Sequence, residues 1–371
     1  MPEYKISLRQ LMIATAMFTI GSGILLVPSG MASTAKQDAW IAALIGVLIG
    51  FAAISVHLLL AKMYPAKNLM QICETLMGKW IGKTVSLLFL VTFFLCGPTT
   101  VLQEIGSFVT IQMMPETPIE AIILLFGVIV ALGARLGLEV LARSIELMFP
   151  WVVFLFTAMT LLLLSEVKLE QTLPVFEFGT LPLFSAALSF ASVVFFPHIM
   201  LLMIYPASVN QPEQAYKAVY IGSLFGSVVL VIVIVLTILV LGPTITAQSM
   251  YPSYMLAQKI SIGNFLQRIE AVMAIMWFIS LFFRLSLYLY MIVAGLAVIF
   301  RIKNSQALML PAGWIMISMA FFIYPNVSYR QSWDAKVWVP YTLVAGVFFP
   351  LLLLVLHGFR KLRTKKSANR A

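Results

Sequence analysis

Charged residues are scarce in this chain, and cysteines are almost missing. Asp, Glu, Lys and Arg make up 10% of the 371 residues, whereas hydrophobic residues make up 61% and the mean hydropathy is +1.01. A soluble domain is usually about 25% charged and no more than about half apolar. No soluble core could bury this much apolar surface, so lipid must solvate most of it. The composition therefore excludes a soluble globular protein and predicts a polytopic membrane protein.

The residues that most enzymes need are also missing or scattered. The two cysteines, Cys73 and Cys96, lie in a polar stretch and in an apolar run, which argues against a disulfide framework. The sequence has no nucleotide-binding loop, no cluster of metal ligands and no Ser/His/Asp set at one membrane depth. We therefore expect no enzyme activity, no catalytic or metal site and no cofactor. The polar start MPEYKISLRQ leads into an apolar run without a cleavage site, so the first helix is expected to remain as its own insertion signal.

Ten stretches are long and apolar enough to cross a membrane, which takes roughly 20 residues. They lie at about 10–30, 40–61, 84–113, 119–135, 145–165, 183–206, 217–242, 267–300, 308–325 and 338–358. The fourth is short, and the third and eighth are long enough to tilt. We expect a single membrane domain over 1–371, with halves of about 10–165 and 183–358 and a basic tail at 359–371.

The basic residues are distributed unevenly between the two sides of this topology. With ten spans, 17 of the 24 Lys and Arg residues fall on the side of the termini, 6 on the other side, and Arg284 inside the eighth span. Because cytoplasmic loops carry the excess of Lys and Arg, we expect both termini in the cytoplasm. The net charge of +10 is then chiefly a topology signal and a contact for anionic lipids. No nucleic-acid partner is expected, since a folded basic domain is missing.

Two spans are interrupted by residues that suit a helix poorly. The first contains TIGSGILLVPSG at 19–30, with Gly21, Ser22 and Gly23 near its centre. The sixth, which begins the second half, contains SVVFFPHIM at 192–200, with Pro197 in its middle. Close helix packing through small residues would explain a glycine pair alone. Interruptions at corresponding places in two halves instead point to a transporter-type binding site, so we predict broken helices in spans one and six.

A broken helix offers binding groups of both signs. Its free N–H groups carry partial positive charge, and its free C=O groups carry partial negative charge. Amides at 21–23 would suit a small anionic group such as an amino acid carboxylate, and carbonyls at the span-six break would suit an ammonium group. Glycine also lets a ligand approach the backbone closely, which makes Gly21 the sharpest site prediction.

Four further motifs, together with the interrupted spans, carry a resemblance that covers essentially the whole chain. They are GKWIG at 78–82, PETPIEAIIL at 115–124, RSIELMFPW at 143–151 and RIEAVMAIMWFISLFFRLSLYLY at 268–290. The chain resembles the amino acid–polyamine–organocation transporter superfamily and, within it, the B subunit of bacterial spore germinant receptors. The resemblance implies an all-α membrane protein with a leucine-transporter-type 5+5 inverted repeat. It also implies sensing of a nutrient, usually an amino acid, in the spore inner membrane beside an A subunit and a lipoprotein C subunit.

In that fold the ligand pocket is lined by spans one, three, six and eight. Mapped onto this chain, the expected pocket residues are Gly21, Ser22, Gly23, Cys96, Gly97, Phe195, Phe196, Pro197, His198, Phe283 and Arg284. Span six departs from the pattern, because no glycine stands at its break.

Two ionisable residues, Glu104 in span three and Arg284 in span eight, lie within the membrane, where such residues are rare and point to function. An ion pair between them is the structural alternative. Arg284 could also face a ligand carboxylate or occupy the space that a coupling cation fills in relatives. Near the start of span five, Glu146 follows Arg143 by three residues, and we expect an interfacial ion pair there rather than a proton relay.

The sequence thus favours a germinant-sensing subunit that binds a small amino acid-like ligand at the broken helices. Binding would shift a conformational equilibrium that the partner subunits read. An amino acid permease, proton-coupled or passive and with no sensing role, is the alternative, because both functions need the same pocket. A pore or structural subunit that binds no ligand is the third possibility.

Overall fold

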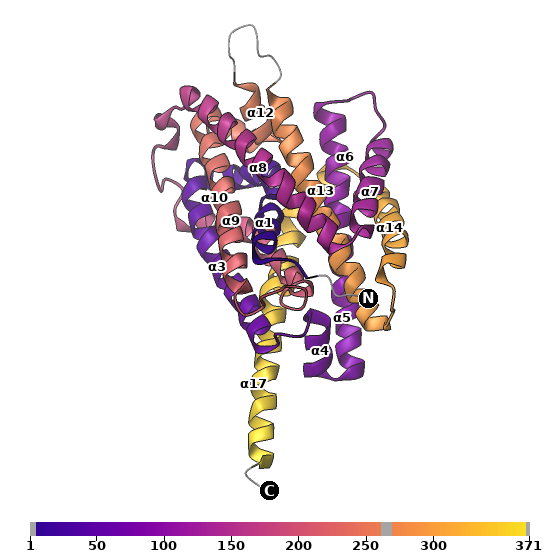
Figure 1. Cartoon of the computed structure of the whole chain (residues 1–371). Helices are drawn as coiled ribbons and strands as arrows, with labels where there is room; N and C mark the ends of the chain where they lie inside the picture. Colours follow the sequence, from indigo (N-terminus) through magenta and orange to yellow (C-terminus); the bar gives the residue numbers. More distant parts are fainter. Residues whose placement is uncertain (1–4, 261–268, 369–371) are drawn as a thin grey trace.

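The computed structural model describes residues 5–260 and 269–368, and nearly all of them lie in helices (Figure 1). In chain order the elements discussed below are α1 (Leu8–Ile20), α2 (Gly23–Ala35), α3 (Ala39–Met63), α4 (Leu69–Met77), α5 (Lys79–Phe94), the π-helical η2 (Leu95–Thr99), α6 (Thr100–Gln112), α7 (Ile119–Arg135), α8 (Leu138–Leu163), α9 (Thr180–Val194), the 3₁₀-helical η5 (Phe196–Met203), α10 (Ala215–Leu241), α11 (Pro243–Gln248), α12 (Pro252–Gln258), α13 (Glu270–Phe300), α14 (Met309–Phe322), α15 (Val327–Trp333), the π-helical η7 (Asp334–Trp338), α16 (Val339–Leu343), the π-helical η8 (Val344–Phe348) and α17 (Phe349–Ala368).

The helices give the predicted polytopic membrane protein. Among the described residues, eight helical segments are long and apolar enough to cross a membrane. One of them, Gly23–Met63, holds both α2 and α3, which separate at Lys36. With α1 and α2 as the two parts of the first span and the 17-residue α7 as the short fourth, the helices match the ten predicted passes. The predicted all-α membrane fold is confirmed.

The first span of each half packs against the second span of the other half. α1, the first span of the first half, packs most extensively on α10, the second span of the second half. α9, the first span of the second half, packs in turn on α3, the second span of the first half. An inverted repeat relates span one to span six and span two to span seven, so it requires this reciprocal pairing. Each broken helix therefore rests on an unbroken helix of the other half.

Glycines four residues apart make both of these contacts close. α3 carries Gly46 and Gly50, and α10 carries Gly222 and Gly226 at the equivalent place. A Cβ at Gly46 would lie 2.8 Å from the carbonyl oxygen of Ala187 in α9, and one at Gly226 would lie 2.9 Å from the carbonyl oxygen of Ala16 in α1. Small residues at this spacing let two helix backbones approach closely in a membrane, where lipid removes the hydrophobic drive for association.

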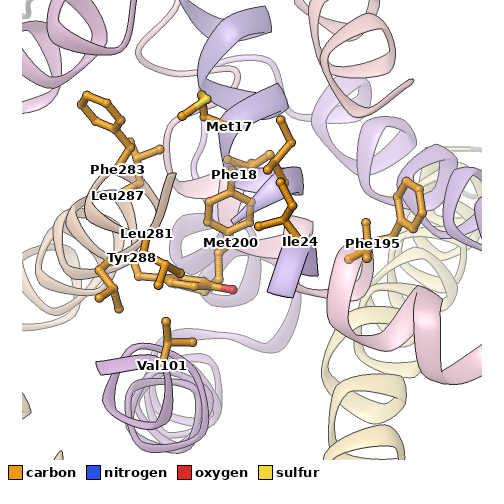
Figure 2. Packing of buried hydrophobic residues seen from close by; sticks show 14 of the residues in the cluster. Met17, Phe18, Ile24, Val101, Phe195, Met200, Leu281, Phe283, Leu287 and Tyr288 are labelled. Carbon is orange, nitrogen blue, oxygen red and sulfur yellow. The ribbon is translucent and has the colours of Figure 1, made fainter. Parts of the chain in front are cut away.

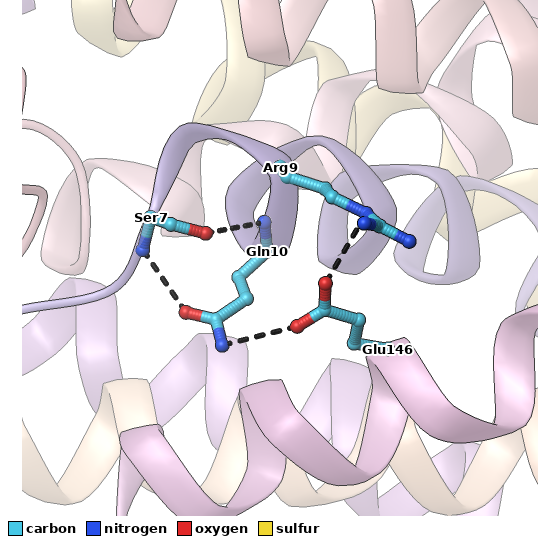
Figure 3. A network of polar contacts seen from close by, with 4 residues as sticks. All are labelled: Ser7, Arg9, Gln10 and Glu146. Carbon is cyan, nitrogen blue, oxygen red and sulfur yellow. Dashed lines mark hydrogen bonds and ion pairs between the residues drawn. The ribbon is translucent and has the colours of Figure 1, made fainter.

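The start of α1 is fixed by polar contacts to distant parts of the chain (Figure 3). Ser7 and Gln10 form a reciprocal capping box, and Gln10 donates to Glu146 of α8 at 3.3 Å. Glu146 also forms an ion pair with Arg9 at 3.1 Å. The predicted pairing of Glu146 with Arg143 is therefore wrong, because Arg143 pairs with Glu139 one turn earlier at 2.6 Å.

The two ends of the bundle differ in shape (Figure 1). α17 continues the last span beyond the bundle, and the short helix α4 lies beside the start of α5 at the same end. The basic tail is helical to Ala368, and Arg360 donates to the carbonyl of Thr75 in α4. Both cysteines are free, and burial of Cys73 in α4 raises the pKa of its thiol to about 12.

The α3–α9 contact provides a test of the packing. Gly50 faces the ring of Phe195, and a Cβ at position 50 would overlap that buried ring. We expect Gly50→Ala to lower the free energy of unfolding by about 1–3 kcal/mol, the usual cost of overpacking a dense core. Thermal unfolding of the purified chain followed by fluorescence would measure the change.

Gly358→Ala is the matched control, since a Cβ at this exposed position in α17 meets nothing within 4 Å. It should leave the stability unchanged or raise it by up to about 1 kcal/mol through helix propensity. Equal melting temperatures for the two variants would contradict the packing described here.

Candidate functional site

The first span is interrupted where the sequence predicts it. α1 ends at Ile20, and α2 begins at Gly23. Gly21 has a φ of +27°, a conformation that side chains with a Cβ rarely adopt, and its N–H donates to Met17 O at 3.0 Å. The helix therefore ends at Gly21, and the predicted break in span one is confirmed.

The sixth span is interrupted in another way. α9 ends at Val194, and the chain continues directly as the 3₁₀ segment η5, whose second residue is Pro197. A proline has no N–H to donate and cannot continue the α-helical pattern. Span six has no glycine at its break, and there the α-helix changes into a 3₁₀-helix at Phe195 instead of unwinding.

Arg284 of α13 lies between the two breaks. Its Nη2 donates to Val193 O at the end of α9 at 3.1 Å and to the Tyr288 hydroxyl at 3.3 Å. A Cβ at Gly21 would overlap Cδ and Nη1 of Arg284, so the space beside this glycine is filled by an arginine. The guanidinium carbon lies 5.1 Å from the centre of the Phe18 ring and 5.6 Å from that of Tyr288. Figure 2 shows these two rings close together between α1 and α13.

His198 connects the two broken helices behind this centre. Its Nε2 lies 2.9 Å from Oγ1 of Thr19, and the Thr19 hydroxyl itself donates to Thr15 O at 2.7 Å. Because that hydroxyl proton is already used, Nε2 of His198 must be the donor. The imidazole also packs edge-on against Phe18 at 5.5 Å. His198 is 2% exposed and holds η5 against α1.

A cavity of about 670 Å³ lies next to the breaks. Much of its wall comes from the two broken spans, with Ser22 and α2 from the first and α9 with Val193 from the sixth. Most of the remaining wall comes from α6 and the chain around span ten. This volume lies within the usual range of small-molecule sites, roughly 300–1,000 Å³. The cavity is therefore large enough for a small organic ligand.

Charged side chains of both signs line this cavity. Glu104 comes from α6, Arg330 from α15 and Asp334 from η7. Glu104 is 7% exposed and Arg330 is 4% exposed, and the charges of Arg330, Asp334 and Arg284 all act on Glu104. Within the described residues, Nε and Nη1 of Arg330 have no hydrogen-bond partner. Such an arrangement can bind an anionic group at Arg330 and a cationic group at the carboxylates.

The predicted site residues fall into separate groups. Ser22 and Glu104 line the cavity, while Gly21, Pro197, His198 and Arg284 lie around the centre between the breaks. The other predicted residues pack against neighbouring helices. Gly23 packs against Leu230, and Cys96 and Gly97 lie in the π-helical segment η2. Phe195 packs against Gly50 and Phe196 against Gly346, while Phe283 is buried beside Phe282. Figure 2 shows Phe195 and Phe283 on opposite sides of the central rings. Pocket membership of these residues stays a prediction.

Two of the alternatives for the intramembrane charges can be compared with the geometry. Within the described part of the chain, no ion pair within 4.0 Å joins Glu104 to Arg284. Glu104 instead faces the cavity, and Arg284 faces the backbone at the breaks. Arg330 and Asp334 are not predicted as cavity residues, because both fall just before the expected start of span ten and look like loop charges in the sequence.

The sequence is similar to a known protein family and to individual members of it. The sequence model of the family described as "Spore germination protein" matches residues 5–330. Spore germination protein KB of Bacillus subtilis (strain 168) is 28% identical over 372 residues, which cover 99% of this chain and 98% of that protein. Spore germination protein B2 of the same organism is 25% identical over 334 residues, which cover 87% and 88% of the two chains.

Solved transporter structures share the fold at low sequence identity. MhsT in complex with L-phenylalanine superposes with a TM-score of 0.64 at 15% identity, covering 94% of this chain and 97% of that one. Mhp1, a nucleobase-cation-symport-1 family transporter in a closed conformation with bromovinylhydantoin bound, superposes with a TM-score of 0.63 at 15% identity, covering 93% and 78%. The chain therefore shares the fold of these two proteins.

The contact between His198 and Thr19 predicts a specific dependence on the hydroxyl group. We expect Thr19→Val to destabilise the protein by about 1–3 kcal/mol, because it leaves a buried imidazole N–H without its acceptor. Thr19→Ser keeps the hydroxyl and should retain most of the stability. Thermal unfolding of the three proteins tests this, and a loss for Thr19→Ser as large as that for Thr19→Val would show that the hydroxyl contributes no more than the methyl group of Thr19.

The contact between Gly21 and Arg284 predicts coupled effects. Gly21→Ala should destabilise by more than about 1 kcal/mol, from its positive φ and from the overlap with Arg284. Adding Arg284→Ala should cost less in this background than in the wild type, with a coupling of about 0.5–3 kcal/mol in a double-mutant cycle. Gly30→Ala is the control, because a Cβ there meets nothing within 4 Å. Strictly additive losses would contradict the contact.

Proposed function

Because the chain belongs to the spore germination protein family, we propose that it is the nutrient-sensing membrane subunit of a spore germinant receptor. Its ligand would be a small amino acid or a similar zwitterion. The family is of the permease type and not a class of enzymes, so binding rather than catalysis is the activity to explain.

One observation carries this proposal: the cavity reaches both broken helices and carries charges of both signs. Ser22 brings the positive N-terminal end of α2 to the cavity, which suits a carboxylate. Arg330 offers two free guanidinium donors for the same group, and Glu104 with Asp334 offers partners for an ammonium group. A zwitterion matches this combination, because each of its charges finds a group of opposite sign on the cavity wall.

Sensing requires that the ligand favours one of two conformations. A ligand held between Ser22 on α2, Val193 on α9 and the charged residues of α6 and span ten would draw these elements together. The A subunit and the lipoprotein C subunit of the receptor would then read the change. We propose that the chain lies in the spore inner membrane, as the resemblance to germinant receptors implies, and that both termini are in the cytoplasm, as its basic residues predict.

A permease with no sensing role is the second candidate, and the transporter fold favours it directly. The two functions share a pocket but differ in flux. A permease reconstituted alone in liposomes should accumulate or equilibrate the radiolabelled amino acid that it binds, whereas a sensor should bind it without transport.

The first test is thermal stabilisation of the purified chain by a panel of amino acids and sugars. A ligand that binds only the folded state raises the apparent stability by RT ln(1 + [L]/Kd), about 2.7 kcal/mol at a hundred times Kd. We expect an amino acid to give a saturable rise in melting temperature. Glu104→Gln should weaken its binding by about 10-fold or more, since it removes one charge from the site while keeping the shape.

Glu116→Gln is the matched control, because Glu116 is exposed in the loop after α6 and does not line the cavity. It should leave the response unchanged. Stabilisation by sugars alone, or an amino acid response that Glu104→Gln leaves intact, would contradict a zwitterion site in this cavity.

A further inference from the structure

The C-terminal ends of two helices, one from each broken span, lie beside the side chain of Arg284. α1 ends at Ile20 and α9 at Val194, so each leaves carbonyl groups without intrahelical partners and carries the negative end of a helix dipole. Nη2 of Arg284 donates to one of these carbonyls, Val193 O, at 3.1 Å. Nη1 and Cδ fill the space beside Gly21, the residue that ends α1. The guanidinium thus lies where two negative helix ends meet.

The other groups around the guanidinium are also of the kind that stabilises a cation. Within the described residues, no carboxylate lies within 4.0 Å of Arg284. The rings of Phe18 and Tyr288 cover it at 5.1 and 5.6 Å, and ring faces attract cations through their negative quadrupole. The Val193 carbonyl, the C-terminal ends of α1 and α9 and two aromatic faces together form an environment for positive charge. Arg284 supplies that charge, and among the described residues its Nε and Nη1 have no hydrogen-bond partner.

In transporter-type folds, unwound carbonyls and helix C-terminal ends are the groups that bind a coupling cation. From the geometry of this chain we propose that Arg284 is a built-in cation that takes this place, so that no metal cation binds between the breaks. The inference goes beyond the ligand function proposed above and depends on the fold, not on the identity of the ligand.

A guanidinium keeps its charge at all physiological pH values, because it cannot be deprotonated in a protein. A second cation would be repelled by it at this short range. Ser280 Oγ also lies 3.3 Å from Gly21 O, although its shorter hydrogen bond, 2.8 Å, is donated to Trp277 O within α13. The central charge is therefore permanent, and no metal cation is needed to supply it.

The test uses the full-length purified chain and no germinant. Apparent melting temperatures are measured in NaCl, KCl and methylguanidinium chloride, each titrated against N-methyl-D-glucamine chloride at constant ionic strength. The proteins compared are the wild type, Arg284→Ala, Arg284→Gln and Arg284→Lys. We expect no cation-specific shift for the wild type and Arg284→Lys, which keep the charge. The two neutral variants should melt lower and regain roughly 1–3 °C, saturably, with methylguanidinium or a small metal cation.

Lys83→Ala is the matched control. Lys83 Nζ also donates to a free carbonyl at a helix C-terminal end, Ile299 O in α13 at 2.7 Å, but it is only half-buried and lies away from the breaks. Water can replace a lost donor there, so this variant should show only the non-specific salt response of the wild type.

Two results would overturn the proposal. A saturable rise of the wild-type melting temperature in NaCl or KCl would mean that a metal cation binds in addition to Arg284. Neutral variants that respond no more than Lys83→Ala would mean that the position is not a cation site. Should Arg284→Ala fail to fold, Arg284→Gln provides the neutral variant, and the wild-type titration tests the proposal by itself. Neither outcome depends on the amino acid panel, which tests the cavity.

Discussion

A permanent positive charge lies in the middle of an apolar membrane domain, and the structure around it follows from the need to stabilise that charge. A buried guanidinium cannot neutralise itself, so the protein must supply partners for it. The helix ending at Val193 and Val194 supplies a carbonyl, and the rings of Phe18 and Tyr288 supply negative faces. Gly21 leaves the room that the side chain of Arg284 needs. Breaking both helices is thus the means by which polar backbone reaches a charge at this depth.

Broken helices are weak elements by themselves, and unbroken ones hold them in place. The glycine pairs of α3 and α10 bring these helices against α9 and α1 so closely that backbone atoms meet. His198 adds one polar contact between the two broken spans through Thr19. The close backbone contacts thus lie on the side of α3 and α10, while the cavity lies between the broken spans, α6 and span ten. The broken spans themselves therefore belong both to this packing and to the wall of the cavity.

Much of this could be predicted from the sequence, because the signals were local. Composition and apolar length gave the membrane class and the ten passes, and GSG at 21–23 gave the first break. The partners of side chains could not be predicted in the same way. Glu146 pairs with Arg9, far away in the chain, although Arg143 is a closer neighbour in sequence. Gly21 was expected to make room for a ligand, but tertiary packing brings Arg284 there instead.

The charged residues of the cavity were missed for a related reason. Arg330 and Asp334 fall before the apolar run of span ten and look like loop charges in the sequence, whereas the helix begins early enough to carry them to the cavity. The glycine pairs at 46–50 and 222–226 were a usable signal, since their equal spacing in two equivalent spans marks the close contacts.

Span ten connects the cavity to the second break by direct contact. Asp334, at its cavity end, begins the π-helical segment η7, and the second π-helical segment, η8, follows two turns later. In η8, Gly346 packs against the backbone of Phe196 at the start of η5, and its carbonyl accepts a hydrogen bond from Nε2 of His57 in α3 at 2.6 Å. π-Helical turns are rare, and they occur mostly as single turns inside α-helices, frequently at functional sites. On the proposed function, a ligand that binds Asp334 acts on a helix with two such turns. The second turn, η8, contacts both the broken span at Phe196 and α3 at His57. With the central charge fixed by Arg284, the charges that change on binding are those of the ligand and of the cavity, so the signal must leave through the helices that line it.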